Sequence, residues 1–277
     1  MSRHTLRVLT LNCWNVSEPL AERMAMIRDG IEALQPDLIG LQEIVVRRDG
    51  FDQGAIILKD LGYECRFGPA FRWNDEGVLL PLHHDGEAFG NLIASRFPIR
   101  RSEVQELPGA ETEERRSALT TLVETPWGIV PFVNTHLNWK LHHGAIRERQ
   151  AVALADIVRA RMRDGTLPPI VVGDLNAEPD STEVRFLCGL TSLDGRSIYF
   201  QDAWRVAGDG SPGFTWDNRN HYAAYSFEPC RRIDYILIGL PDLHGRGWIE
   251  TVRLAFTRPK GEVFASDHFG LVAEVRV

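Results

Sequence analysis

The sequence predicts an α/β fold built on mixed β-sheets, and three observations lead to this class. Apolar and β-branched runs of strand length are intermixed with amphipathic helical segments along the chain. Some runs are continuously apolar, which is typical of buried strands. Other strands follow one another directly, as residues 119–124 and 129–135 do around the turn-like segment 125–128. Mixed sheets accommodate this arrangement better than a purely parallel sheet does.

In the first half of the chain, the spacing of apolar residues predicts each element. Residues 7–12 alternate and are apolar or β-branched, which indicates a strand. Residues 21–34 carry apolar side chains three and four positions apart, which indicates a helix ended by Pro36. The remaining elements of this half are strands at 37–43 and 91–94 and a helix at 54–61. Residues 68–90 have no clear period and predict a long loop.

The second half continues the same alternation. Residues 145–161 place their apolar side chains on one side of a strong helix. Two prolines at 168 and 169 then break the chain before a buried-type strand at 170–174. A helix is predicted at 182–190, with Asp180 or Ser181 as its N-cap. The last predicted strands are 233–238, 252–256 and 271–277.

Length and composition favour one domain over residues 1–277. The chain is 44% hydrophobic, which is enough for a sizeable core, and no linker or repeat divides it. No apolar stretch approaches transmembrane length, and the N-terminus lacks a signal-peptide pattern. Four widely spaced cysteines are compatible with free thiols in a reducing compartment. We therefore expect a cytoplasmic protein, and no feature indicates a protein partner.

The charge balance bears on the substrate. The chain has 31 Lys and Arg residues against 38 Asp and Glu residues, for a formal net charge of -7. Proteins that grip long nucleic acids usually carry a basic surface. The net acidity therefore weakens, without excluding, a function on polymeric nucleic acid.

Polar motifs stand at the ends of several predicted strands. They combine carboxylates and amides, which suit a hard cation such as Mg²⁺, with imidazoles, which suit proton transfer near neutral pH. If the strands aim these groups at one point, they outline a metal-dependent phosphoesterase site. The motifs are Leu11-Asn12, Leu41-Gln42-Glu43, Asn134-Thr135-His136-Leu137, Gly173-Asp174-Leu175-Asn176, Arg232-Ile233-Asp234-Tyr235-Ile236 and Ser266-Asp267-His268.

In their order along nearly the whole chain, these motifs resemble those of the endonuclease/exonuclease/phosphatase superfamily. Each motif alone is weak evidence, because short matches are often accidental. Six in the family's order are a specific match. The resemblance implies a DNase I-like fold, a four-layer α/β sandwich with two packed mixed β-sheets. It also implies an active site at one edge of that sandwich.

The resemblance implies a magnesium site with Glu43 as the primary ligand, Asp267 as a second carboxylate and Asn12 as a group that orients the metal shell or the phosphate. Mn²⁺ is a possible substitute. The residue chemistry agrees, because a carboxylate just past a buried strand needs a cation or water. The alternative to a metal-binding role is that Glu43 is a solvated residue at a strand end and that Asn12 forms a turn.

The resemblance assigns the catalytic groups to the other motifs. Asp174 and Asn176 resemble the pair that positions the attacking water and the phosphate, although an Asx-turn would also explain them. His268 is expected to act as general base or transition-state stabiliser, oriented by Asp234. His136 is expected to contact the phosphate from the opposite side.

Structural alternatives remain open at two places. For Asp234, the alternative is a structural salt bridge to Arg231 or Arg232. The run Glu114-Arg115-Arg116 precedes a strand, where an arginine is able to hold a phosphate, but we interpret the run as solvated.

The expected reaction is Mg²⁺-dependent hydrolysis of a phosphodiester by in-line attack of water. The segment after Asn176 lacks the Tyr-Arg typical of inositol polyphosphate 5-phosphatases, which lowers that possibility. The expected substrate is a phosphoester of a nucleotide, a nucleic-acid end or a phospholipid head group. The alternatives are an endonuclease or exonuclease on polymeric nucleic acid, a neutral sphingomyelinase-like phospholipase C, and a non-catalytic binding protein on the same scaffold.

Overall fold

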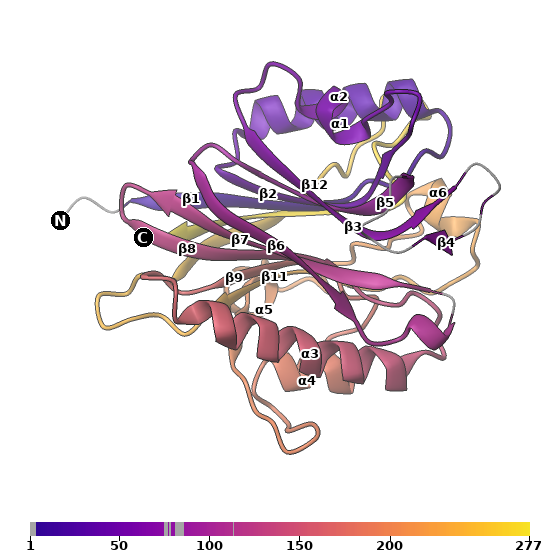
Figure 1. Cartoon of the computed structure of the whole chain (residues 1–277). Helices are drawn as coiled ribbons and strands as arrows, with labels where there is room; N and C mark the ends of the chain where they lie inside the picture. The colour runs from indigo at the N-terminus through magenta and orange to yellow at the C-terminus, as the bar shows by residue number, and fades with distance from the viewer. Residues whose placement is uncertain (1–3, 75–76, 78, 81–85, 113) are drawn as a thin grey trace.

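The computed structural model describes residues 4–74, 77, 79–80, 86–112 and 114–277. Two β-sheets pack face to face, and helices cover the outer face of each sheet (Figure 1). This arrangement confirms the predicted four-layer α/β sandwich with two mixed sheets. No helix in these ranges has both the length and the apolar character needed to cross a membrane.

The first sheet contains the N-terminal strand of the described chain at its centre. Within the described residues it has seven strands in the order β12-β13-β1-β2-β5-β3-β4. The pair β1 and β2 is parallel and the other pairs are antiparallel, so the sheet is mixed. Its strands are β1 (Thr5–Asn12), β2 (Leu38–Val46), β3 (Glu64–Trp73), β4 (Leu79–Leu80), β5 (Glu87–Ser95), β12 (Ile249–Ala255) and β13 (Gly270–Arg276).

The second sheet comes mainly from the middle of the chain. Its described strands have the order β10-β11-β9-β8-β7-β6, and only β8 and β9 are parallel among them. The predicted hairpin joins β7 and β8 at Thr125 and Gly128. The strands are β6 (Ile99–Leu107), β7 (Arg116–Thr125), β8 (Gly128–His136), β9 (Ile170–Asp174), β10 (Phe200–Asp202) and β11 (Asp234–Gly239).

The helices divide between the two outer faces. In Figure 1, α1 and α2 lie on the first sheet, and α3 and α4 lie on the second. Ser181 caps α4 by accepting a hydrogen bond from Val184 N, as one of the two predicted N-caps. The helices are α1 (Leu20–Leu34), α2 (Gln53–Leu58), α3 (Gly144–Met162), α4 (Thr182–Leu187), α5 (Ala203–Ala207) and α6 (His221–Ala224), with a 3-10 turn at Ala110–Thr112.

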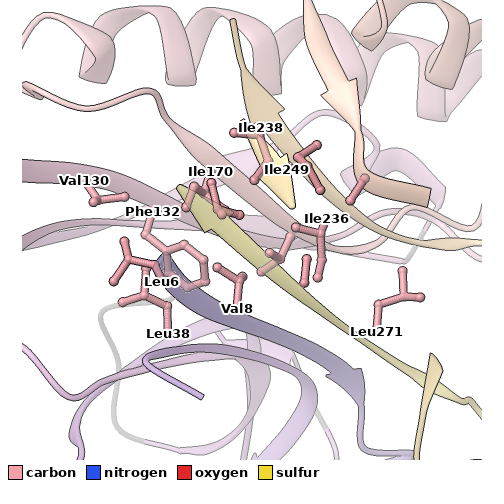
Figure 2. Packing of buried hydrophobic residues seen from close by; sticks show 14 of the residues in the cluster. Leu6, Val8, Leu38, Val130, Phe132, Ile170, Ile236, Ile238, Ile249 and Leu271 are labelled. Carbon is pink, nitrogen blue, oxygen red and sulfur yellow. The ribbon is translucent and has the colours of Figure 1, made fainter. Parts of the chain in front are cut away.

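The main core lies between the sheets and is aliphatic. Figure 2 shows Val8 and Leu271 of the first sheet facing Phe132 and Ile236 of the second. The polar residue Asn134 is also fully buried and reaches from the second sheet to the first. Its amide nitrogen donates to the carbonyls of Leu41 and Leu92, each at 2.8 Å, and so links β8 to both β2 and β5. Asn134 therefore fixes the sheets against each other two residues before His136.

The prediction of a long loop at residues 68–90 is wrong, because most of the described residues in this range belong to strands. Strand β3 continues to Trp73, β5 begins at Glu87, and the two are paired antiparallel. A register shift between Pro69 and Phe71 interrupts the alternation that would have indicated a strand. Gly90 allows the strands to approach, since a Cβ there would lie 2.1 Å from Gly68 O. Residues 75–76, 78 and 81–85 of the predicted loop lie outside the described ranges.

Two further strands were not predicted. The polar stretch Ile99–Leu107 forms β6 at the edge of the second sheet, where most of its side chains are at least partly exposed. The short Phe200–Asp202 forms β10 at the other edge. Strand β6 is largely exposed and therefore carries a weak apolar pattern, whereas β10 is buried but its three residues are too few to show a period.

Candidate active site

The second sheet places three polar side chains in one row. His136 ends β8, Asp174 ends β9, and Asp234 begins the antiparallel β11. In the strand register, Asp174 is the partner of both His136 and Asp234. All three are buried, so strand pairing alone brings motifs from three distant parts of the sequence together.

The first sheet supplies Asn12 and Glu43 from neighbouring parallel strands. Asn12 ends β1, and Glu43 lies at a register shift of β2 with a φ of 61°. The Asn12 amide donates to Asp174 Oδ2 at 3.0 Å and to Glu43 Oε1 at 3.3 Å. Asn15 donates to the other Glu43 oxygen at 2.9 Å. Asn12 therefore connects a carboxylate of each sheet.

His268 and Asp234 form a buried pair. Nδ1 of His268 lies 2.8 Å from Asp234 Oδ2, and its Nε2 lies 3.7 Å from Asp174 Oδ2. Burial by itself lowers the pKa of His268, but Asp234 and Asp174 outweigh it and raise the pKa to about 10. The ring is therefore an imidazolium at neutral pH, held with one N–H directed at each carboxylate.

Asp174 and Asn176 are positioned by a tight turn after β9. Gly173 has a φ of 148°, and a Cβ there would lie 1.9 Å from Thr135 O, so only glycine fits. The Asn176 backbone N–H donates to Asp174 Oδ1 at 2.9 Å, which is the predicted Asx-turn. Burial, together with the charge of Asp234, raises the pKa of Asp174 to about 7. The turn thus coexists with a buried carboxylate whose pKa is raised.

His136 is held from behind by Arg116. A guanidinium nitrogen of Arg116 lies 2.9 Å from His136 Nδ1, and the same guanidinium binds Glu114 Oε1 at 2.6 and 3.0 Å. Arg116 is only 5% exposed. The interpretation of the 114–116 run as solvated is therefore wrong for Glu114 and Arg116, because each becomes buried against the other. Burial, reinforced by Arg116, lowers the pKa of His136 well below its usual value.

The carboxylates fit a divalent cation. Burial and the neighbouring charge of Glu43 raise the pKa of Asp267 to about 7, so a cation beside these two carboxylates would offset their repulsion. Among the described residues, the metal-capable His, Cys, Asp and Glu groups whose ligand atoms all lie within 4.8 Å are Asp174, Asp234 and His268. Since His268 already donates to Asp234, we favour the oxygen set around Glu43 for a hard cation.

A cavity of about 250 Å³ joins these groups. Seven of the eight predicted site residues line it, and Asp234 lies behind His268 instead. The predicted residues on its wall are Asn12, Glu43, His136, Asp174, Asn176, Asp267 and His268. The wall also includes residues that the sequence did not single out for the site, namely Trp14, Asn15, Glu228, Arg231 and Ile233.

The arginines before β11 do not bind Asp234. Arg231 forms an ion pair with Glu228, and Arg232 binds both oxygens of Asp202 at 3.1 and 2.8 Å. The structural alternative for Asp234 is therefore wrong, and its carboxylate remains available to His268. Arg231 also brings a positive charge to the cavity wall, where an anionic substrate would lie.

The comparisons with known proteins agree with this geometry. The model of the Endonuclease/Exonuclease/phosphatase family matches residues 9–268. The chain belongs to this family. Its members are hydrolases that act on phosphoester bonds, and they generally depend on divalent metal ions. The match thus confirms, over most of the chain, the family membership that the sequence motifs predicted.

Individual relatives are distant. Nocturnin from Xenopus laevis is 28% identical over 222 residues, which cover 78% of this chain and 53% of that protein. The chain spans about half the length of the curated relatives it matches. A family member from Beutenbergia cavernae is 26% identical with a TM-score of 0.75, covering 99% of this chain and 72% of that one.

The fold is also shared with TDP2 from D. rerio, whose structure contains a single-strand DNA product. That protein is 19% identical with a TM-score of 0.74, and the match covers 99% of both chains. At this identity the likeness concerns the fold.

Proposed function

We propose that residues 1–277 act as one catalytic domain that hydrolyses phosphodiesters with Mg²⁺, or Mn²⁺ in its place. The substrate is a nucleotide, a nucleic-acid end or a phospholipid head group. The observation that carries the proposal is the row of His136, Asp174 and the Asp234–His268 pair beside the cavity. A binding protein would have no need of an imidazolium buried between two carboxylates.

The protein groups divide the reaction between them. Water attacks phosphorus in line, the bond to the leaving oxygen breaks, and the leaving oxygen takes a proton from solvent water. Asp174 accepts the proton of the water, since a pKa of about 7 suits a general base at neutral pH. The His268 imidazolium stabilises charge on the phosphoryl oxygens, as the expected transition-state stabiliser rather than a base. Asn176 and His136 are the other residues that contact the phosphoryl group.

The metal is assigned to Glu43, Asp267 and Asn12. When bound, a divalent cation neutralises negative charge on the phosphoryl group. Glu43 and Asp267 supply the carboxylate oxygens, whose mutual repulsion the cation relieves. The Asn12 amide nitrogen holds Glu43 and Asp174, so Asn12 orients ligands.

The test compares bis-p-nitrophenyl phosphate with p-nitrophenyl phosphate in Mg²⁺, Mn²⁺ and EDTA, with His268→Ala as control. We expect metal-dependent hydrolysis of the diester that EDTA and the substitution both abolish. Faster hydrolysis of the monoester would replace the proposal with a phosphatase function. Turnover that persists in His268→Ala would reject the assigned mechanism.

We propose a cytoplasmic location from the state of the cysteines. The four cysteines at positions 13, 65, 188 and 230 are all free. Free thiols are usual in a reducing cytoplasm, which is where we place the protein.

A further inference from the structure

A second cavity opens beside the catalytic one. It has a volume of about 440 Å³ and shares Asn15, Glu43 and Trp139 with the catalytic cavity. The other described residues on its wall are Phe71, Phe89, Thr112, Glu114, Arg116 and Lys140. Because the two cavities share a wall, one ligand is able to place a phosphate in the first and an attached group in the second.

One side of the second cavity is built from aromatic rings. Phe71 and Phe89 are cross-strand partners of β3 and β5, with ring centroids 5.0 Å apart and planes inclined by 19°. Trp73 continues the series at 5.5 Å from Phe71, and the His136 ring follows Phe89 at 6.5 Å. We call Trp73, Phe71 and Phe89 the aromatic row. The row leads from half-buried surface positions to a ring of the catalytic cavity.

Another part of the wall contains Trp139 together with Glu114 and Arg116. Trp139 is 53% exposed, so most of its ring is free for contact. Its backbone N–H donates to Glu114 Oε1 at 2.8 Å, and the same oxygen binds Arg116. Lys140 adds a positive charge at the wall. The cavity therefore combines flat apolar surfaces with two cations, Arg116 and Lys140, and two carboxylates, Glu43 and Glu114, and its wall is connected to His136 by hydrogen bonds.

We propose that the second cavity binds a nucleobase attached to the phosphodiester, and that the proposed phosphodiesterase therefore acts on nucleotides or single-stranded nucleic-acid ends. The proposal rests on the proposed function and selects among its substrates. Rings of aromatic side chains stack on any base, whereas a phospholipid head group offers no flat ring to them. Lys140 adds a positive charge that suits the negative backbone carrying the base, whereas Arg116 is already paired with Glu114.

The kinetic test uses Phe71→Leu and Phe89→Leu, which keep apolar volume in the strands and remove the flat ring. The substrates are thymidine 3′- and 5′-(p-nitrophenyl phosphate) and methyl p-nitrophenyl phosphate, which share one leaving group. Loss of a stacking partner costs roughly 5- to 150-fold. We expect the ratio of kcat/KM between the better nucleotide ester and the methyl ester to fall about tenfold in each variant. Trp248→Leu removes an exposed aromatic ring outside both cavities and leaves the ratio unchanged.

The kinetic test distinguishes failure of the base-site proposal from failure of the proposed phosphodiesterase function. If the wild-type protein hydrolyses all three esters and the ratio stays constant in both variants, the base site is rejected and the phosphodiesterase stands. If it hydrolyses none of them, the proposed function is rejected, and the base-site proposal falls with it.

A binding measurement adds a readout that needs no turnover. Oligonucleotides with 2-aminopurine at either end are titrated onto His268→Ala, and stacking quenches the fluorescence of this base. We expect quenching at one end, about tenfold weaker binding in His268→Ala/Phe89→Leu, and no change in His268→Ala/Trp248→Leu. Equal binding by the three proteins rejects the base site. Should Phe71→Leu fail to fold, Phe89→Leu and Trp139→Ala carry both measurements.

Discussion

The guanidinium of Arg116 lies 2.9 Å from Nδ1 of His136. A guanidinium donates hydrogen bonds and cannot accept them, so Nδ1 must be the accepting nitrogen of the ring. The neutral imidazole then carries its proton on Nε2, which lies 3.4 Å from Asp174 Oδ2 at the catalytic cavity. The Asn176 amide lies 3.0 Å from the same nitrogen, so this tautomer requires that the amide turn its oxygen rather than its nitrogen toward Nε2. Arg116 is therefore a positioning residue that makes His136 a hydrogen-bond donor toward the cavity.

Removal of that guanidinium should lower the rate. In Arg116→Met we expect kcat to fall by roughly 100-fold, because either ring nitrogen of His136 is then free to carry the proton. Arg116→Lys, whose ammonium also only donates, should recover part of the loss. The ¹⁵N chemical shifts of His136 should report one tautomer in the wild type and a mixture in Arg116→Met. Equal rates in the Met and Lys variants together with unchanged shifts would contradict this role.

The Asp234–His268 pair makes a second prediction. Asp234→Asn keeps the shape of the side chain but removes the charge that holds the imidazolium. We expect kcat to fall by roughly 10³-fold, with a smaller change in KM, because the lost interaction strengthens in the transition state. Steady-state kinetics on bis-p-nitrophenyl phosphate measures both parameters. Asp202→Asn, which disturbs the neighbouring Arg232 pair instead, is the matched control and should retain most of the activity.

The strands that carry the site were predictable because their signals are local. Strand β9 is a continuous apolar run that ends at Asp174, and β1 alternates up to Asn12. Both need only their own residues to be recognised. The row of His136, Asp174 and Asp234 depends on register, which the sequence alone does not display. Resemblance to a known family supplied what periodicity could not.

The missed features depend on distant partners. Arg116 looks like part of an exposed charge run, and it becomes buried only because Glu114 and His136 meet it from two directions. The strand character of β3 is hidden because Phe71 follows a register shift and half-buried residues occupy both faces. Neither property is encoded in the spacing of nearby residues.

Asn134 should be important for stability rather than catalysis. It satisfies the carbonyls of Leu41 and Leu92, and its own Oδ1 accepts from Gln42 Nε2 at 2.7 Å. Replacement by leucine leaves these buried groups without partners, so we expect a loss of about 2–5 kcal/mol in the free energy of unfolding. Urea denaturation measures the loss. A change below 1 kcal/mol, on the order of one net hydrogen bond, would mean that water replaces the amide.

Metal binding should be visible without substrate. A ligand at 100 times its Kd stabilises the folded state by about 2.7 kcal/mol, which for a chain of this size raises Tm by roughly 5–10 °C. We expect Mg²⁺ to produce such a rise in the wild type and little in Glu43→Gln. Glu250→Gln, which loses only an ion pair with Arg276, is the control and should keep the full rise. An equal rise in Glu43→Gln would move the metal site elsewhere.

His136 should make stability depend on pH in a defined direction. Its pKa in the folded protein is lowered well below the usual 6.5 by burial and by Arg116. Above pH 6.5 the ring is neutral in both states, so its contribution is fully present. As the pH falls below 6.5, His136 becomes protonated in the unfolded chain but stays neutral in the folded protein. The free energy of unfolding therefore falls by up to about 1.4 kcal/mol per pH unit until the pKa of the folded state is reached.

The buried carboxylates of Asp174 and Asp267 act with the opposite sign, because their raised pKa values favour protonation of the folded state in the same range. The contribution of His136 must therefore be measured as a difference. We expect the stability of the wild type relative to His136→Gln to decrease as the pH is lowered from 7 to 5 in urea denaturation. A difference that stays constant over this interval would show that His136 titrates alike in the folded and unfolded states.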